Sequence, residues 1–302
     1  MGISLCIATY NRLHSLKECV ESIVDKFEGY PYEIVVADGG STDGTLEYLR
    51  EIEHVNLIEI GRLTGGVKSY NTAFRSAKMD YITSLNDDFV ICPDVFVKAC
   101  LLMDDNPSIA LVSSKMLEPT RSNYPNIVKE HGLVVYKSHI IRTKVFREIG
   151  FFDENFKTYQ VDMDSYYSIL KLGHTVISTR EPAIIHKRIF DILRKDNKKI
   201  VEKEQELEYY NQKWMGFFEE INNYLSSNLH LKHKYRLFSV LWDMSRFRLL
   251  HPLMKKQFKL YVDIYDWLMQ GCVVFKDERY DRLKDFFLAQ KIPKEILLNM
   301  ES

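Results

Sequence analysis

The chain has 302 residues, 46% of them hydrophobic, and its 41 Lys and Arg residues nearly balance 42 Asp and Glu residues, for a net charge of −1. This length can bury the core of one large domain with an appendage, or the cores of two domains. The balanced charge argues against a dedicated nucleic-acid-binding protein, because such proteins carry a basic excess on the domain that binds.

The five cysteines favour buried free thiols in a reducing compartment, because their number is odd and no two form a C-x-x-C pair. The first residues, MGISLCIATYNR, lack a basic leader followed by a long apolar region. No stretch reaches the roughly 18 uninterrupted apolar residues that a membrane span needs. We therefore expect a cytoplasmic protein.

The first part of the chain alternates the patterns of buried strands and amphipathic helices. Short apolar runs predict strands at residues 3–8, 32–37, 55–60, 80–85 and 109–113. Helical spacing of apolar residues predicts helices at 13–24, 45–52, 66–78 and from Asp94 to about residue 103. Such alternation is typical of an α/β fold with a mostly parallel sheet flanked by helices on both faces.

Three polar clusters follow strands of this predicted sheet. TYNR (9–12) follows the first strand, DGGSTDG (38–44) the second, and NDD (86–88) the fourth. In open α/β sheets, ligands bind at the carboxyl ends of the strands. The three clusters together therefore indicate a ligand site at this edge.

The NDD cluster raises a question of charge. Asp87 and Asp88 are adjacent carboxylates at the end of an apolar strand, where they lose solvation and repel each other. A solvated turn, a salt-bridge partner or a metal ion could compensate them, and these residues alone leave all three open.

The composition changes near residue 190, and we place a domain boundary there. Residues 130–189 complete the first domain (1–190), whereas residues 191–302 contain few Gly or Pro and show helical periodicity. Within that region, residues 230–259 combine basic side chains with an apolar helical face. This pattern is compatible with peripheral contact at the inner face of a membrane. Packing on the first domain, or on a second subunit of a homo-oligomer, is the commoner use of such a face.

Four motifs, in order along the chain, resemble family 2 of the inverting glycosyltransferases: SLCIATYNR, YEIVVADGGSTDGT, LNDD and GFFDENFKTYQVDMD. The resemblance covers roughly residues 3–190 and implies a GT-A fold with a C-terminal helical extension. It implies transfer of a sugar from a nucleotide donor to a hydroxyl group of a glycan or lipid-linked acceptor, with Mn²⁺ or Mg²⁺ as cofactor. A UDP-sugar is the expected donor, and a dTDP-sugar is the nearest competitor because thymine offers the same imide N–H.

The resemblance also implies which residues bind the nucleotide. Asp38 would accept a hydrogen bond from the base N–H, and Thr9, Asn11 and Arg12 would lie near the same nucleoside. The alternative for Asp38 is a turn-forming residue that accepts hydrogen bonds from its own backbone.

By the same resemblance, Asp88 would bind the divalent ion, and Asp87 would lie close to the ribose and diphosphate. His186 stands about where the family often carries a histidine that completes the metal site, and imidazole suits Mn²⁺ better than Mg²⁺. The chain departs from the fully acidic motif at Asn86. The alternatives are a solvent-exposed Asx turn for the cluster and an ordinary core histidine for His186.

Asp162 matches the family's general base, which deprotonates the attacking hydroxyl group. The acid that usually precedes this base is replaced by Val161, a departure that bears on acceptor binding. Alternatively, Asp162 and Asp164 are acids favoured at a helix start by the helix dipole.

Gly66 and Lys68 begin the helix that follows the third strand. Backbone N–H groups at such a start could receive an anion such as a diphosphate. Helix capping explains the glycines equally well.

Two other functions stay open. A sugar-phosphate nucleotidylyltransferase should carry a Gly-rich, Arg-containing loop after the first strand, and TYNRLHS is not such a loop. A non-catalytic nucleotide- or carbohydrate-binding protein stays an alternative because of the departures at Asn86 and Val161.

Overall fold

The computed structural model describes residues 1–118, 127–130, 133–136, 138–187, 203–228, 279 and 286–301. Its strands are β1 (Ile3–Thr9), β2 (Tyr32–Asp38), β3 (Val55–Glu59), β4 (Tyr81–Asn86), β5 (Phe89–Ile91), β6 (Ile109–Leu117), β7 (Ile127–Glu130), β8 (Leu133–Tyr136), β9 (Ser138–Arg142), β10 (Thr175–His186) and β11 (Phe286–Gln290). Its helices are α1 (Leu13–Glu21), α2 (Thr45–Arg50), α3 (Gly66–Ser76), α4 (Pro93–Asp105), α5 (Thr143–Glu148), α6 (Val161–Lys171), α8 (Lys203–Ser227) and α12 (Lys294–Glu301).

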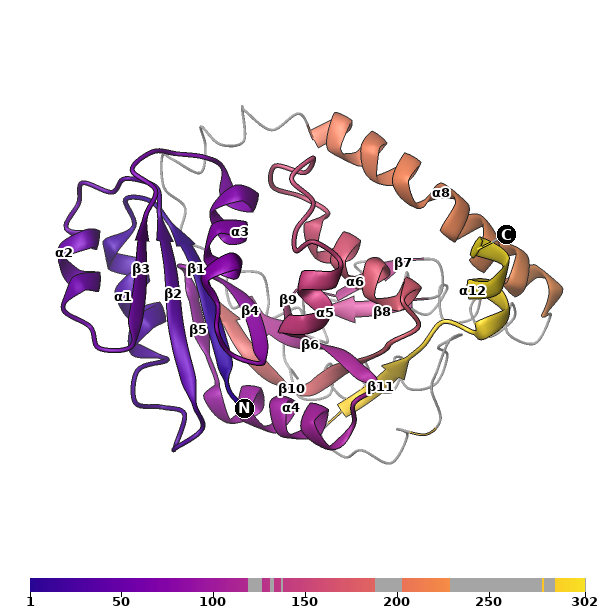
Figure 1. Ribbon diagram of the computed structural model, residues 1–302, viewed down its shortest axis with the longest axis horizontal. Helices are drawn as coiled ribbons and strands as arrows, with labels where there is room; N and C mark the ends of the chain where they lie inside the picture. Colours follow the sequence, from indigo (N-terminus) through magenta and orange to yellow (C-terminus); the bar gives the residue numbers. More distant parts are fainter. Residues whose placement is uncertain are drawn as a thin grey trace, which may run out of the picture.

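Within these described residues, nine strands form one sheet in the order β11-β10-β6-β9-β4-β1-β2-β3, and β5 pairs with β10 beside this path (Figure 1). The pairs β1–β2, β1–β4, β2–β3 and β6–β10 are parallel. Strand β9 lies between β4 and β6 and is antiparallel to both. Strands β1, β2, β3, β4, β6 and β10 therefore run in the same direction and end at one edge of the sheet.

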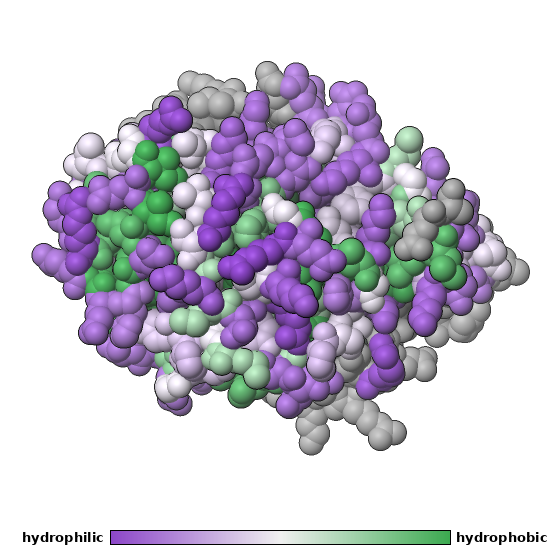
Figure 2. All heavy atoms as spheres, viewed as in Figure 1, coloured by the Kyte–Doolittle hydropathy of each residue, from purple (hydrophilic) through white to green (hydrophobic). Residues whose placement is uncertain are grey.

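Apolar residues fill both faces of the sheet. One core contains buried side chains of α3, α5, α6, α8 and α12, and the other contains those of α1, α2 and α4. The expectation of a mostly parallel sheet with helices on both faces is confirmed. Charged and polar side chains predominate on the surface in Figure 2, where apolar side chains gather in separate patches.

The predicted elements of the first 117 residues are all present, and their ends differ by a few residues. Helix α1, for example, ends at Glu21 rather than at residue 24. The free thiols of Cys6, Cys19 and Cys100 are buried as expected, and that of Cys92 is half-buried. The fifth cysteine, Cys272, lies outside the described residues.

The described part of the C-terminal region joins the same sheet and core. Strand β11 pairs antiparallel with β10, so that Val176 lies opposite Gln290. On α8, the rings of Trp214 and Phe217 contact Tyr167 of α6, with centroids 5.4 and 5.7 Å away. The prediction that residues 191–302 are helical therefore missed β11. The boundary near residue 190 and the interpretation of residues 230–259 stay predictions, because residues 188–202 and 229–278 lie outside the described residues.

None of the described helices combines the length and the apolar character that crossing a membrane would need.

Phe74 tests the packing of the core below α3. Its side chain is fully buried, and its ring lies 4.9 Å from Phe146 and 5.1 Å from Phe152 between centroids. Phe74→Ala should lower the free energy of unfolding by about 3–5 kcal/mol in denaturant melts, because it leaves a cavity. Leu298→Ala, at a side chain that is 66% exposed, should change it by less than about 0.5 kcal/mol. Equal effects of the two variants would contradict this packing.

Candidate active site

The loops after β1 and β2 are joined by short polar side chains. The Asn11 backbone N–H donates to Ser41 Oγ (2.8 Å), and Asn11 Oδ1 accepts from the Thr42 N–H (2.7 Å). Asp38 Oδ1 accepts from the backbone N–H groups of Gly40 and Ser41, both at 2.8 Å, and Asp38 Oδ2 accepts from the Ser41 hydroxyl at 2.5 Å.

These contacts are those of a turn-forming aspartate, which accepts hydrogen bonds from the residues that follow it. Its side chain is fully buried, and three donors already occupy its oxygens. A carboxylate has about four acceptor positions, so one is left for a further donor. Recognition of a base by Asp38 stays a prediction.

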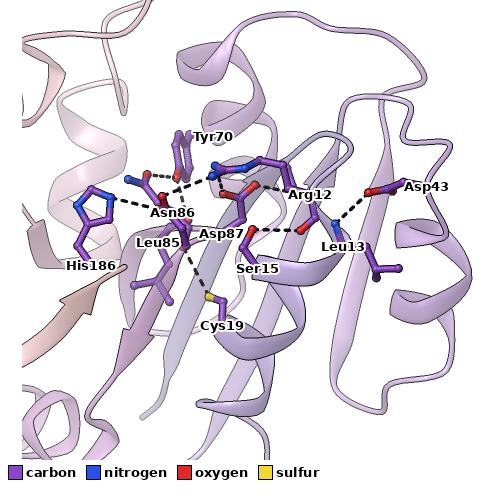
Figure 3. Close-up of polar contacts among 12 residues, drawn as sticks. Arg12, Leu13, Ser15, Cys19, Asp43, Tyr70, Leu85, Asn86, Asp87 and His186 are labelled. Atoms are coloured by element: carbon purple, nitrogen blue, oxygen red, sulfur yellow. Dashed lines mark hydrogen bonds and ion pairs between the residues drawn. The ribbon is translucent and has the colours of Figure 1, made fainter. Parts of the chain in front are cut away.

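The paired acids after β4 are buried, and Figure 3 shows Arg12 bonded to Asp87. Asp87 and Asp88 are 4% and 2% exposed, so they do not form a solvent-exposed turn. Arg12 Nη1 donates to Asp87 Oδ1 at 2.5 Å, and Arg12 Nη2 lies 3.5 Å from Asp88 Oδ2. The Thr9 hydroxyl donates to Asp87 Oδ2 at 3.0 Å. A salt-bridge partner therefore compensates part of the charge, and binding of the nucleotide by Arg12 stays a prediction.

Strand pairing brings His186 to the same acids. Strand β5 follows the acid pair directly and lies antiparallel to the end of β10, so Phe89 is opposite His186. The backbone N–H of Lys187 donates to the Asp88 carbonyl at 3.0 Å. As a result, His186 Nε2 lies 3.3 Å from Asp88 Oδ1, although the two residues are far apart in the sequence.

Glu118 is a further member of this cluster that the sequence analysis missed. It follows β6, which pairs with β10 so that Leu117 lies opposite Ile185. Its Oε1 lies 3.3 Å from His186 Nδ1, and its side chain is buried. Such a carboxylate fixes the orientation of an imidazole whose other nitrogen binds a ligand. An acid directly after a buried strand, as in NDD, is the sequence signal that could have found it.

The donor set fits a divalent cation. Two ligands at right angles on one ion, each with a bond of about 2.1 Å, lie about 3 Å apart. The 3.3 Å between Asp88 Oδ1 and His186 Nε2 is close to that separation. In the part of the chain that the structure describes, no three His, Cys, Asp or Glu side chains form a group that could hold a metal by themselves. Such a pair suits an ion that takes its other ligands from phosphate and water.

Helix α3 reaches the end of β4 through Tyr70, which the sequence analysis also missed. The Tyr70 hydroxyl lies 2.8 Å from the Leu85 carbonyl oxygen and 3.0 Å from Asn86 Oδ1. Burial, followed by the charges of Asp87 and Asp88, raises the pKa of Tyr70 well above its usual value. The helix begins with exposed Gly66 and Lys68.

Asp162 lies on the first turn of α6, and it is half-buried between two buried neighbours. Its charge also contributes, after those of Asp87 and Asp88, to the raised pKa of Tyr70. Asp162 is therefore near enough to interact electrostatically with Tyr70, whose hydroxyl group contacts Asn86 at the end of β4. Asp164 occupies the same turn, as the helix-start alternative expects, but it is buried and contacts α8.

His186 predicts a pH effect on the metal-free protein. Burial lowers the pKa of His186, but its contacts with Asp88 and Glu118 outweigh burial, so the net shift is upward from 6.5. A histidine whose pKa is higher in the folded than in the unfolded protein stabilises the folded state. This stabilisation is complete at pH values below the pKa of the unfolded protein, and it is lost as the pH rises through the pKa of the folded protein. In EDTA, the wild type should therefore exceed His186→Gln in Tm by more at pH 6 than at pH 8. Exposed His14→Gln is the control, and an advantage that does not shrink would contradict the assignment.

Arg12 should matter more to stability than a surface arginine in a similar ion pair. Arg12→Met leaves buried Asp87 without this cation and should cost about 3 kcal/mol of unfolding free energy. Arg50→Met breaks a pair with Glu59, at 2.7 Å between half-exposed side chains, and should lower the free energy of unfolding much less. Denaturant melts of the two variants test this, and equal losses would contradict it.

The sequence is similar to a family of known enzymes over more than half of its length. The profile of "Glycosyl transferase family 2" matches residues 4–164. Chondroitin synthase of Escherichia coli is 29% identical over 143 residues, which are 44% of this chain and 20% of that protein. Poly(ribitol-phosphate) beta-glucosyltransferase of Bacillus spizizenii is 24% identical over 231 residues, which are 64% of this chain and 36% of that protein. The chain thus spans a minor part of these relatives.

Solved structures share the fold. S. aureus TarS 1-349 in complex with UDP-GlcNAc superimposes with a TM-score of 0.60 at 18% identity, over 94% of this chain and 84% of that one. The complex of the same protein with UDP gives 0.53 at 20% identity, over 61% of this chain and 60% of that one. With its GT-A fold and its match to the family profile, the chain belongs to family 2 of the glycosyltransferases.

Proposed function

We propose that the chain is an inverting, metal-dependent glycosyltransferase that moves a sugar from a UDP-sugar to a hydroxyl group of a glycan or lipid-linked acceptor. Membership of family 2 supports the reaction class. The observation that carries the proposal is the buried acid pair at the end of β4, with His186 Nε2 3.3 Å from Asp88 Oδ1. Buried acids are costly unless they are paired or bind a metal ion, and Arg12 pairs mainly with Asp87.

Asp88 and His186 are the residues that would hold Mn²⁺ or Mg²⁺. When bound, the ion would neutralise charge on the diphosphate leaving group. Glu118 orients the His186 ring through Nδ1, and Arg12 holds Asp87 in place. Arg12 also lies 3.5 Å from Asp88 Oδ2 through Nη2, so both proposed ligands have a charged neighbour before the donor arrives. Such preorganisation lowers the entropy cost of binding.

The donor would lie across the strand ends between α1 and α3. Thr9, Asn11 and Asp38 form the loops proposed to surround the nucleoside. The start of α3, with exposed Gly66 and Lys68, offers backbone N–H groups and a cation to the diphosphate. TarS is solved with UDP and with UDP-GlcNAc, which supports a UDP-sugar over a dTDP-sugar.

Asp162 is the proposed general base. Its half-buried side chain stands on the first turn of α6, and its charge acts on Tyr70, whose hydroxyl group contacts Asn86 at the end of β4. Inversion needs a base on the acceptor side of the sugar, so that the hydroxyl group loses its proton as it attacks the anomeric carbon. The similarity to a chondroitin synthase and to a poly(ribitol-phosphate) beta-glucosyltransferase supports a polymeric acceptor.

Asp162→Asn tests the assignment of the base. With Mn²⁺ and a panel of UDP-sugars, release of UDP by the wild type identifies the donor that is turned over. Asp162→Asn should lower kcat for that donor by about 10²–10⁴-fold, because the amide cannot accept the proton. Affinity for UDP, measured by calorimetry, should stay unchanged, and exposed Asp105→Asn is the matched control.

Undiminished turnover by Asp162→Asn would refute the base assignment. Turnover of none of the UDP-sugars by the wild type, together with turnover of a dTDP-sugar, would keep the enzyme class and change the donor.

A further inference from the structure

The segment that leads to Asp162 has strained ends. Residues 151–160 lie in the connection between α5 and α6, and both Phe151 (φ +66°) and Gln160 (φ +67°) adopt the left-handed conformation. This conformation is unfavourable for residues other than glycine, so it persists only where surrounding contacts hold it. The contacts that hold this segment therefore fix the backbone just before α6, and Gln160 precedes Asp162 by two residues.

Helix α3 holds the beginning of the segment. Buried Asn71 donates from Nδ2 to the Phe152 carbonyl oxygen (2.8 Å) and accepts the Phe152 N–H at Oδ1 (3.1 Å). Arg75 Nη2 lies 3.0 Å from Glu154 Oε1. The first residues of the segment are therefore fixed to the helix that begins with Gly66.

Helix α8 holds the rest of the segment, from the C-terminal region. Buried Glu206 accepts the backbone N–H groups of Lys157 (3.0 Å) and Tyr159 (2.9 Å). The Tyr209 hydroxyl donates to Asp153 Oδ2 at 2.8 Å. These bonds run from one face of a single helix to three points of the segment.

Lys213 connects the segment to α6 itself. Its Nζ lies 2.8 Å from Asp153 Oδ2 and 2.7 Å from Asp164 Oδ1. The Trp214 indole N–H donates to the same Asp164 oxygen at 2.9 Å. Burial lowers the pKa of Lys213, but the two carboxylates outweigh burial and raise it, so the side chain stays a cation at neutral pH.

We propose that Lys213 is a positioning residue for the general base. By bridging Asp153 in the connecting segment and Asp164 in the first turn of α6, it fixes the direction in which Asp162 points. This inference rests on the function proposed above, and it gives α8 a part in the reaction. Displacement of a reacting group by about 1 Å costs about 10²-fold in rate, so loss of this bridge should reduce catalysis without touching donor binding.

The test compares Lys213→Met with Lys213→Arg. Arginine can reach both carboxylates with its two terminal nitrogens, whereas methionine keeps the apolar stem and removes the charge. Lys171→Met, at an exposed lysine in the last turn of α6, is the control. The readouts are hydrogen–deuterium exchange of peptides that cover residues 153–164, UDP affinity by calorimetry, and kcat and KM for release of UDP from the UDP-sugar that the wild type uses.

Lys213→Met should raise exchange in residues 153–164 and lower kcat by at least about tenfold, with KM and UDP affinity within about twofold of wild type. Lys213→Arg should restore both exchange and kcat. Unchanged exchange or unchanged kcat in Lys213→Met would overturn the proposal, and so would equal losses in kcat and in UDP affinity.

Two further outcomes, a variant that does not fold and a wild type without turnover, can be told apart from failure of the proposal. If Lys213→Met does not fold, Asp153→Asn removes one arm of the bridge, and it should raise exchange in residues 153–160 while Asp164 keeps its contacts with Lys213 and Trp214. Unchanged exchange in that variant would overturn the proposal. If the wild type turns over no nucleotide-sugar, the proposed function fails, and the exchange experiment still decides whether Lys213 holds the segment.

Discussion

The burial of two adjacent carboxylates, Asp87 and Asp88, is the constraint on which the candidate site depends. Each is almost without solvent, and neighbouring like charges in such a place are costly. Arg12 comes from the end of β1 and His186 from the end of β10, and both approach these acids. Replacing a buried ion pair by apolar residues often costs no stability, so stability alone does not account for this cluster. The proposed binding of a cation together with a diphosphate would account for it.

A second set of contacts holds the segment before the proposed base, and these contacts come from different parts of the chain. Helix α3 faces the acid pair through Tyr70 and holds the segment before Asp162 through Asn71. Helix α8 holds the same segment through Glu206 and Lys213. Helix α3, which is proposed to receive the diphosphate, therefore contacts the segment that leads to the proposed base. This arrangement suits a reaction in which the donor and the attacking hydroxyl group must be aligned.

Local sequence patterns were sufficient for the elements of the first 117 residues other than the short strand β5. They also predicted the clustering of polar residues at strand ends, because both depend on short-range periodicity and on the common direction of the strands. They were not sufficient where distant segments pair. The antiparallel insertion of β9, the addition of β11, and the contacts of Glu118 and Lys213 depend on registers between segments far apart in the sequence. His186 was found through its family position, and the pairing of β5 with β10 explains its place. For Asp38, turn chemistry already accounts for three of its acceptor contacts.

Calorimetric titration of UDP into the purified protein, with and without Mn²⁺ and beside GDP and dTDP, tests the central claim most directly. If the acids at the end of β4 bind a cation whose remaining ligands come from the diphosphate, UDP should bind at least about tenfold more tightly with Mn²⁺ than in EDTA. GDP should bind more weakly than UDP. Binding of UDP with the same affinity in Mn²⁺ and in EDTA, or no binding of any of the three nucleotides, would contradict the account.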